Sequence, residues 1–333
     1  MEHQDIANKH ISVLLAELVS AIDIKTDTQN VIVDATLWMA GHACEIISQL
    51  HDGDILIGFD ADTRNLPLAR QRIEAASATT GKQFHICWPD DLFQAQDNAI
   101  NILLIHSNFE YLKTKLAEHN IMSITGIYYD LWISSLHVDE AERWFSFRAD
   151  GPLDMRFDVT SWNTAADIVN GYLQAELRQI FVDYWEEPGS TKIAARIVEQ
   201  RKIAKILTTQ RLVEVIESVN THPKTKTRIF QALRIEVNKE LDTIKTSLRD
   251  AIDLLKEDGN IFVISFHSLE DRITKQIFKT ESKNCICSDI ICSCWHVRSL
   301  KIVTKKPILP SSEEIEKNSR SRSAKARHAI KIT

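Results

Sequence analysis

The sequence predicts an α/β fold, in which a doubly wound parallel sheet is interrupted by an inserted helical domain. Apolar, β-branched runs separated by helix-length segments predict parallel strands with crossover helices, and they cover residues 31–36, 54–60, 100–107 and 123–133. Between about residues 140 and 218 such runs stop, and apolar residues recur at the three- and four-residue spacing of helices. We therefore expect residues 1–139 and 219–333 to form the sheet domain and residues 140–218 the helical insertion.

The chain is expected to return to the sheet after the insertion. One long amphipathic helix is predicted from roughly Thr225 to Lys256, followed by Gly259 and a strand at residues 261–267. This strand would complete the carboxyl-terminal half of the sheet domain.

Composition and charge describe an ordinary globular chain. The 333 residues are 44% hydrophobic and 26% charged, which suits one large domain and a smaller one. No signal-peptide pattern and no apolar run of about 18 residues is present, so a cytoplasmic protein without a membrane span is predicted. The net charge of −6 argues against general nucleic-acid binding, and any RNA contact should be local. After Glu316 a tail without acids carries Lys317, Arg320, Arg322, Lys325, Arg327 and Lys331.

Acidic residues stand at the carboxyl ends of three predicted strands. Asp34 ends the first strand, Asp60 the second and Asp130 the fourth. Open α/β sheets bind ligands at this edge, and a strand-end acid commonly holds ribose hydroxyls. A single such acid is equally well explained as a helix cap. Three together favour a nucleoside-type cofactor, and the pattern alone does not separate S-adenosylmethionine (SAM) from NAD, although no GxGxxG is present.

Several sequence blocks resemble the RsmH (MraW) family of 16S rRNA cytosine-N4 methyltransferases over nearly the whole chain. They occur in the family's order and are HISVLLAE (10–17), HSNF (106–109), EAERWFSFRADGPLDMRFD (140–158), HPKTKTRIFQALRIEVNKEL (222–241), SFHSLEDR (265–272), TKKPILPSSEEI (304–315) and NSRSRSAKAR (318–327). The resemblance implies a Rossmann-like, SAM-dependent methyltransferase domain interrupted by a helical substrate domain. It also implies that the partner is the small ribosomal subunit with its 16S rRNA.

The resemblance also implies where SAM binds. Its methionine end would lie on Ala40, Gly41 and His42, where backbone N–H groups at a helix start suit a carboxylate. Asp60 would hold the ribose and the ring of Phe109 would cover the adenine. The pocket would be completed by Asp130 and by His137, which replaces a common glutamine.

Asp130 is the first candidate for catalysis. The lone pair of cytosine N4 is delocalised into the ring, so an acceptor must hold the amino hydrogens and stabilise the charge that develops on nitrogen. Ser134 and Ser135 could orient the base or could be plain turn residues.

Candidate RNA contacts lie in two other segments. In the insertion they are Asp154, Met155 and Arg156; Arg156 suits a phosphate or a base, although a structural ion pair is the alternative. In the basic tail the candidates are Arg320 and Arg322.

Tryptophan replaces glycine at family positions. Six of the seven tryptophans follow this rule, and they are Trp38, Trp132, Trp144, Trp162, Trp185 and Trp295. One cause would explain all six: a source gene that reads UGA as glycine, translated here as tryptophan. The count of 9 glycines in 333 residues, against a usual share of about 7%, agrees with this interpretation. The alternative is a degenerate relative that has lost SAM binding, which the small residues at other usual glycine sites, such as Ala40, also fit.

Four cysteines form the pattern C-x-C-x4-C-x-C: Cys285, Cys287, Cys292 and Cys294. Four thiolates within so short a segment can close a tetrahedral zinc site, which would be structural. Ordinary reduced thiols are the alternative, because the usual C-x2-C spacing is missing.

Two classes of function remain after these observations. The first is the RNA methyltransferase, and the second is a catalytically inactive RNA-binding relative. A small-molecule methyltransferase is less well supported, because it would have no use for the helical insertion and the basic tail.

Overall fold

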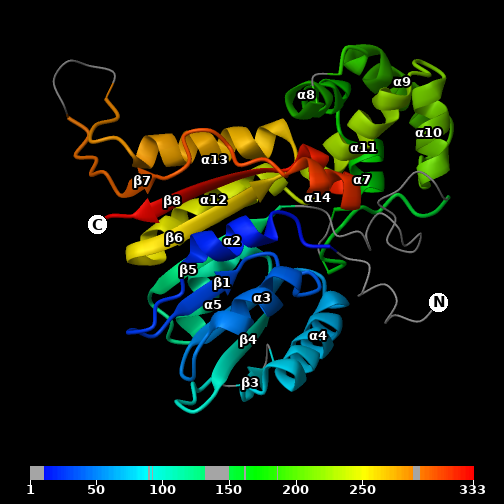
Figure 1. The fold of residues 1–333 in the computed structure, drawn as a ribbon. Helices are drawn as coiled ribbons and strands as arrows, with labels where there is room; N and C mark the ends of the chain where they lie inside the picture. The colour runs from blue at the N-terminus through cyan, green and yellow to red at the C-terminus, as the bar shows by residue number, and fades with distance from the viewer. Residues whose placement is uncertain are drawn as a thin grey trace. The chain divides into compact units, whose positions relative to one another are not determined.

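The fold is described by a computed structural model, shown in Figure 1. It divides into two compact units, the first formed by Met1–Trp132 and Asp242–Thr333 and the second by Ile133–Leu241. Within these units the structure describes residues 11–88, 91, 93–131, 150–160, 163–185, 187–287 and 293–333.

The first unit is built on an eight-stranded sheet, counted over the described residues, with the order β3-β4-β2-β1-β5-β6-β8-β7. The strands are β1 (Val31–Asp34), β2 (Ile55–Asp60), β3 (Phe84–Cys87), β4 (Ile100–His106), β5 (Ile124–Asp130), β6 (Leu255–Ser265), β7 (Leu300–Ile302) and β8 (Lys325–Lys331). Strands β1 to β6 pair in parallel, whereas β8 is antiparallel to both β6 and β7. The α/β fold predicted from the sequence is confirmed. The order reverses beside β1, so the switch point of the sheet lies between β1 and β5.

Helices cover both faces of this sheet (Figure 1). One face carries α2 (Leu15–Ile22), α3 (Gly41–Gln49) and α4 (Asn65–Thr80), whose apolar residues share one core cluster with the strands. The opposite face carries α5 (Leu112–Glu118), α12 (Glu240–Leu254) and α13 (Ser268–Glu281). Two consecutive residues of β5 point to opposite faces of the sheet. The Tyr128 hydroxyl donates to Asp34, whereas the Tyr129 hydroxyl contacts Ser247 of α12.

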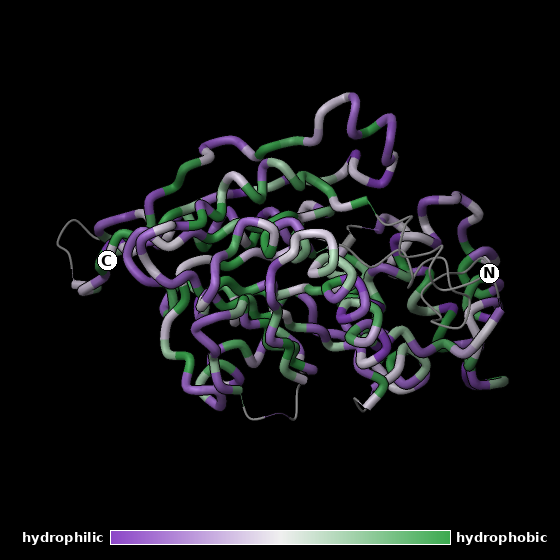
Figure 2. Tube along the Cα trace, turned by 60° about the horizontal axis from the view of Figure 1, so that its bottom comes forward, coloured by the Kyte–Doolittle hydropathy of each residue, from purple (hydrophilic) through white to green (hydrophobic). Residues whose placement is uncertain are grey.

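The second unit is helical. Its helices are α7 (Ala165–Gly171), α8 (Gln174–Trp185), α9 (Ser190–Ile203), α10 (Thr209–Glu217) and α11 (Pro223–Val237). They bury their own apolar cluster, which includes Ile229, Phe230 and Leu233 of α11. In Figure 2 the hydrophobic stretches of the chain recur in the interior and hydrophilic ones along the outer turns. Among the described residues, no helix is long and apolar enough to span a membrane.

The single long helix predicted over residues 225–256 is wrong. The chain forms α11 and α12 instead, because Asn238 caps α11 and Lys239 adopts a left-handed conformation with φ of 46°. Since α11 packs in the helical core, the boundary expected at residue 218 falls inside the helical unit.

The segment that was expected to be a basic tail is instead largely part of the sheet. Strand β8 lies between β6 and β7, and Arg327 is buried in an ion pair with Asp271 of α13, with Nε 2.7 Å from the carboxylate. Only the short stretch before β8 presents exposed arginines: Arg320 and Arg322 lie in the 3-10 turn η3 (Ser319–Ser323). Pairing with β6 explains why this charged strand is ordered, since its small and apolar residues face the core.

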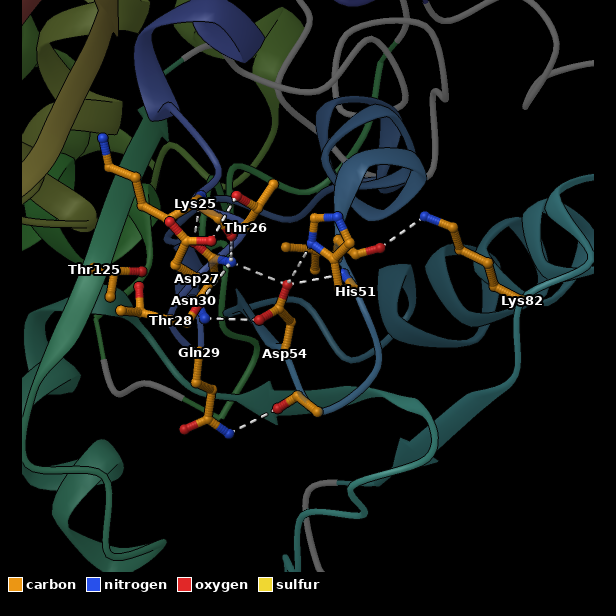
Figure 3. A network of polar contacts seen from close by, with 12 residues as sticks. Lys25, Thr26, Asp27, Thr28, Gln29, Asn30, His51, Asp54, Lys82 and Thr125 are labelled. Carbon is orange, nitrogen blue, oxygen red and sulfur yellow. Dashed lines mark hydrogen bonds and ion pairs between the residues drawn. The ribbon is translucent and has the colours of Figure 1, made fainter.

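A polar network ties the amino ends of β1 and β2 together (Figure 3). The Asp54 carboxylate accepts hydrogen bonds from the backbone N–H of Asn30 at 2.7 Å, from its side-chain amide at 3.0 Å and from the backbone N–H of His51 at 2.8 Å. Gln29 donates to the Gly53 carbonyl at 2.7 Å. This network fixes the register of the two strands whose opposite ends carry the candidate site.

Candidate functional site

Three buried acids meet at the carboxyl edge of the sheet. Asp34, Asp60 and Asp130 are the last residues of β1, β2 and β5, and their exposed fractions are 2%, 6% and 3%. Strand β1 pairs with β2 on one side and with β5 on the other, with Asp34 opposite Gly58 of β2 and opposite Tyr128 of β5. The ends of the three strands are therefore adjacent, and their acids lie around the switch point. The sequence predicted this juxtaposition.

Neighbouring groups donate hydrogen bonds to the Asp60 carboxylate. The Asp62 backbone N–H donates to it at 2.8 Å, and the Asn65 side-chain amide lies 3.2 Å from both carboxylate oxygens. Burial raises the pKa of Asp60 to about 8, although these donors act in the opposite direction. Asp62 is instead paired with Arg64, whose Nη2 lies 2.7 Å from its carboxylate. The sequence did not identify Asn65 as a site residue, because its contact with Asp60 depends on where the fold places the start of α4.

Asp34 and Asp130 are linked through their surroundings. Asp34 accepts hydrogen bonds from the Tyr128 hydroxyl at 2.9 Å and the Thr36 backbone at 3.0 Å, and burial raises its pKa to about 7. The Thr36 hydroxyl accepts from the Asp130 backbone N–H at 2.7 Å, and the Trp38 indole donates to the Asp130 carbonyl at 3.1 Å. The ends of β1 and β5 are therefore held together by side chains as well as by the sheet. Tyr128 had not been identified from the sequence.

The turn between β1 and α3 has the backbone geometry expected for close approach to a ligand. Trp38 and Ala40 have φ of 48° and 55°, in the left-handed region that favours glycine. At Gly41 a Cβ atom would collide with the Ser12 hydroxyl, so no larger residue fits without movement. The predicted Ala40, Gly41 and His42 thus lie together at the start of α3.

His42 connects this turn to Asp130. Its Nε2 lies 2.9 Å from the Val13 carbonyl and therefore donates, while Nδ1 lies 3.6 Å from the Asp130 carboxylate. Burial lowers the pKa of His42, so the neutral ring is favoured. The neutral ring therefore turns Nδ1, the nitrogen that carries no proton, toward Asp130.

Phe109 is positioned next to the same sheet edge. It begins the 3-10 turn η1 (Phe109–Tyr111) after β4, it is partly exposed, and its ring meets the edge of Tyr129 at 5.7 Å between centroids. A half-covered aromatic face is available here for a planar group. Three other predicted residues, Ser134, Ser135 and His137, lie outside the described residues.

In the helical unit, Arg156 is paired with Asp154. The guanidinium makes two contacts of 2.7 Å with this carboxylate, and Nη1 donates to the Val159 carbonyl at 2.8 Å. The ion pair that the sequence left open is therefore present. The Met155 side chain is 1% exposed and belongs to the core of the helical unit, which leaves its backbone rather than its side chain for any substrate contact.

Backbone geometry at two tryptophans matches a glycine position. Trp38 is left-handed, as described above, and Trp295 has φ of 50° with 93% of its surface exposed. Trp185 ends α8, whereas Trp132, Trp144 and Trp162 lie outside the described residues. Of the three described positions, Trp38 and Trp295 thus have the backbone geometry of a glycine position, whereas Trp185 in α8 is not among the residues with positive φ.

Three of the four clustered cysteines come together in the connection between α13 and β7. Sulfur atoms of Cys285, Cys287 and Cys294 all lie within 4.8 Å of one another. Cys292 lies outside the described residues.

Known proteins resemble this chain along nearly its whole length. A protein of Clostridioides difficile strain 630 is 42% identical over 97% of this chain and 99% of its own, and its name is ribosomal RNA small subunit methyltransferase H. Proteins of the same name from Caldicellulosiruptor saccharolyticus and Brevibacillus brevis are 42% and 40% identical, over 97% of this chain and 99% and 98% of their own. The profile of the MraW methylase family matches residues 7–332. The chain is a member of the MraW methylase family.

Proposed function

We propose that this protein transfers a methyl group from SAM to the exocyclic N4 of a cytidine in the 16S rRNA of the small ribosomal subunit. The observation that carries the proposal is the gathering of Asp34, Asp60 and Asp130, all buried, at the switch point of a parallel sheet. Membership of a methylase family supports methyl transfer, and the name shared by the relatives supports small-subunit RNA as the substrate. A cytoplasmic location follows from that substrate.

The residues at the sheet edge fit SAM. Burial raises the pKa of Asp60 to about 8 although Asp62 and Asn65 donate to it, and two ribose hydroxyls would add hydrogen bonds that favour its charged form. The backbone at Ala40 and Gly41, which opens α3, would hold the methionine carboxylate. Phe109 would cover the adenine. When bound, SAM supplies a methyl group activated by the positive sulfur.

Asp130 would hold and deprotonate the amino group that receives the methyl. Its carboxylate accepts the N4 hydrogens, which turns the nitrogen lone pair out of conjugation with the ring and toward the methyl carbon. The Asp130 carboxylate would take up the N4 proton that is released when the amino nitrogen receives the methyl group. The neutral His42 ring, whose Nδ1 lies 3.6 Å from that carboxylate, would not cancel its charge. Both Ser134 and Ser135 remain candidates for orienting the base.

RNA contacts are proposed at two places. Arg320 and Arg322 are exposed on η3 and would meet phosphates. The proposed substrate contacts of the helical unit are Asp154, Met155 and Arg156. Arg156 would contact the RNA while its guanidinium also binds Asp154.

A catalytically inactive RNA-binding relative is the second candidate, and Trp38 is the observation that favours it. Its indole is hydrogen-bonded to the Asp130 carbonyl and so occupies space at the edge where SAM would bind. If the gene encodes glycine there, this objection disappears. The codons at the tryptophan positions decide between the two.

The experiment that tests the proposal measures SAM binding and methyl uptake on the same preparations. Tritiated SAM and small ribosomal subunits lacking the modification would be incubated with the chain as written and with the chain carrying glycine at the six tryptophan positions. We expect methyl incorporation with the glycine form and little with the tryptophan form. SAM binding without any incorporation, in both forms, would favour the inactive relative.

A further inference from the structure

The connection between α13 and β7 gathers three cysteine thiols far from the cysteines of the rest of the fold. Cys285, Cys287 and Cys294 have sulfur atoms that all lie within 4.8 Å of one another. Cys44 and Cys87 belong to α3 and β3. Nothing in the proposed methyl transfer uses this cluster.

The separation of two of these sulfurs matches a metal site. The Sγ atoms of Cys285 and Cys294 are 3.8 Å apart. Two thiolates on a tetrahedral zinc ion, with Zn–S bonds of about 2.3 Å, are separated by about 3.8 Å. A disulfide would need about 2.05 Å instead. This one pair is therefore spaced as two zinc ligands are, and Cys287 lies within 4.8 Å of both.

The backbone around the cluster favours thiolates. Each of the three sulfurs accepts a backbone N–H: Cys285 from Cys287 at 3.4 Å, Cys294 from Ile286 at 3.5 Å, and Cys287 from Ser293 at 3.2 Å. Donors of this kind orient ligating sulfurs and compensate their negative charge around a bound metal.

Among its described residues, the segment that carries the thiols is held mainly where it returns to α13. Its return is anchored on α13, because the Ser299 backbone donates to the Glu281 carbonyl at 2.9 Å and the His296 ring lies 3.1 Å from the Thr280 carbonyl. Between these anchors, Ile286 and Val297 leave 47% and 71% of their surfaces exposed, so apolar burial contributes little. A cross-link by metal would fix such a long connection.

We propose that Cys285, Cys287 and Cys294 bind a zinc ion that stabilises the connection between α13 and β7. The ion would be structural, because its ligands come from one short segment; the three thiolates more than balance its charge and leave the site with a net charge of −1. The fourth coordination position is left for water or for a ligand beyond the described residues.

The test measures metal directly and needs no activity assay. Full-length protein without a histidine tag, purified under reducing conditions, would be analysed for zinc by mass spectrometry before and after incubation with zinc and removal of excess. We expect about one zinc ion per chain. Cys285→Ser and Cys294→Ser should each lower the zinc content strongly, while Cys87→Ser, which removes a cysteine from β3, should leave it unchanged.

Cobalt substitution covers the case in which the serine variants fail to fold. Cobalt bound to the unaltered protein should give an intense thiolate-to-cobalt charge-transfer band, which excess zinc removes. Absence of that band, or of zinc after reconstitution, would overturn the proposal. Zinc retained by the double variant Cys285→Ser, Cys294→Ser would overturn it as well, and so would a Cys285–Cys294 disulfide in protein kept reduced.

Discussion

Proton release from Asp60 should accompany SAM binding. Burial raises the pKa of this carboxyl to about 8 in the free protein, whereas ribose hydroxyls would favour its ionised form. Below pH 8 binding must therefore first remove a proton, and each pH unit costs about 1.4 kcal/mol, or tenfold in affinity. The affinity at pH 6 should be up to about 100-fold weaker than on the plateau above pH 8.

Calorimetric titration with SAM between pH 6 and 9 measures this dependence, using the chain with glycine restored at the six tryptophan positions. Because the amino group of SAM also titrates in this range, Asp60→Asn serves as the matched control. It keeps the shape of Asp60 and the titration of the ligand while removing the ionisable carboxyl. The affinity ratio of parent to variant should be large at pH 9 and approach one at pH 6. A ratio that stays constant with pH would refute the assignment of Asp60 to the ribose.

Three further changes should separate binding, catalysis and stability. Asp130→Asn should keep SAM affinity within a few-fold but slow methyl transfer by about 2–4 kcal/mol of barrier in single-turnover assays; unchanged turnover would exclude its role. Asp34→Asn should raise the melting temperature at pH 8 and not at pH 4. Burial raises the folded-state pKa of Asp34 to about 7, so the parent protein loses up to about 4 kcal/mol of stability as the pH rises from about 4 to 7. Equal shifts at both pH values would contradict this cause. Glycine restored at positions 38, 132, 144, 162, 185 and 295 should recover SAM binding, as measured by calorimetry. Full activity of the tryptophan form would refute the recoding interpretation.

The central strands could be predicted because parallel strands buried on both faces are continuous apolar runs. Strands β1, β2, β4 and β5 all lie within the segments expected from the sequence. Their terminal acids followed directly, since the carboxyl ends of parallel strands share one edge. The candidate site was therefore predictable as far as it depends on strand ends and on family blocks.

Features that depend on distant partners could not be predicted in the same way. The break between α11 and α12 rests on the left-handed Lys239, which has no glycine to signal it, and on Asn238, whose amide reaches the Met155 carbonyl. Strand β8 looked like a charged tail because Arg327 finds its partner, Asp271, in a helix more than fifty residues away. Asn65 was missed for the same reason: its role exists only through the folded position of Asp60.

Product identity tests the central claim most directly. The glycine-restored chain would be incubated with SAM bearing a deuterated methyl group and with small ribosomal subunits lacking the modification, and the 16S rRNA would be digested to nucleosides for mass spectrometry. The account predicts one labelled methyl group per subunit, on the exocyclic nitrogen of a cytidine, and its loss with Asp130→Asn. Label on a carbon or a ribose oxygen, or no label from a protein that binds SAM, would contradict it.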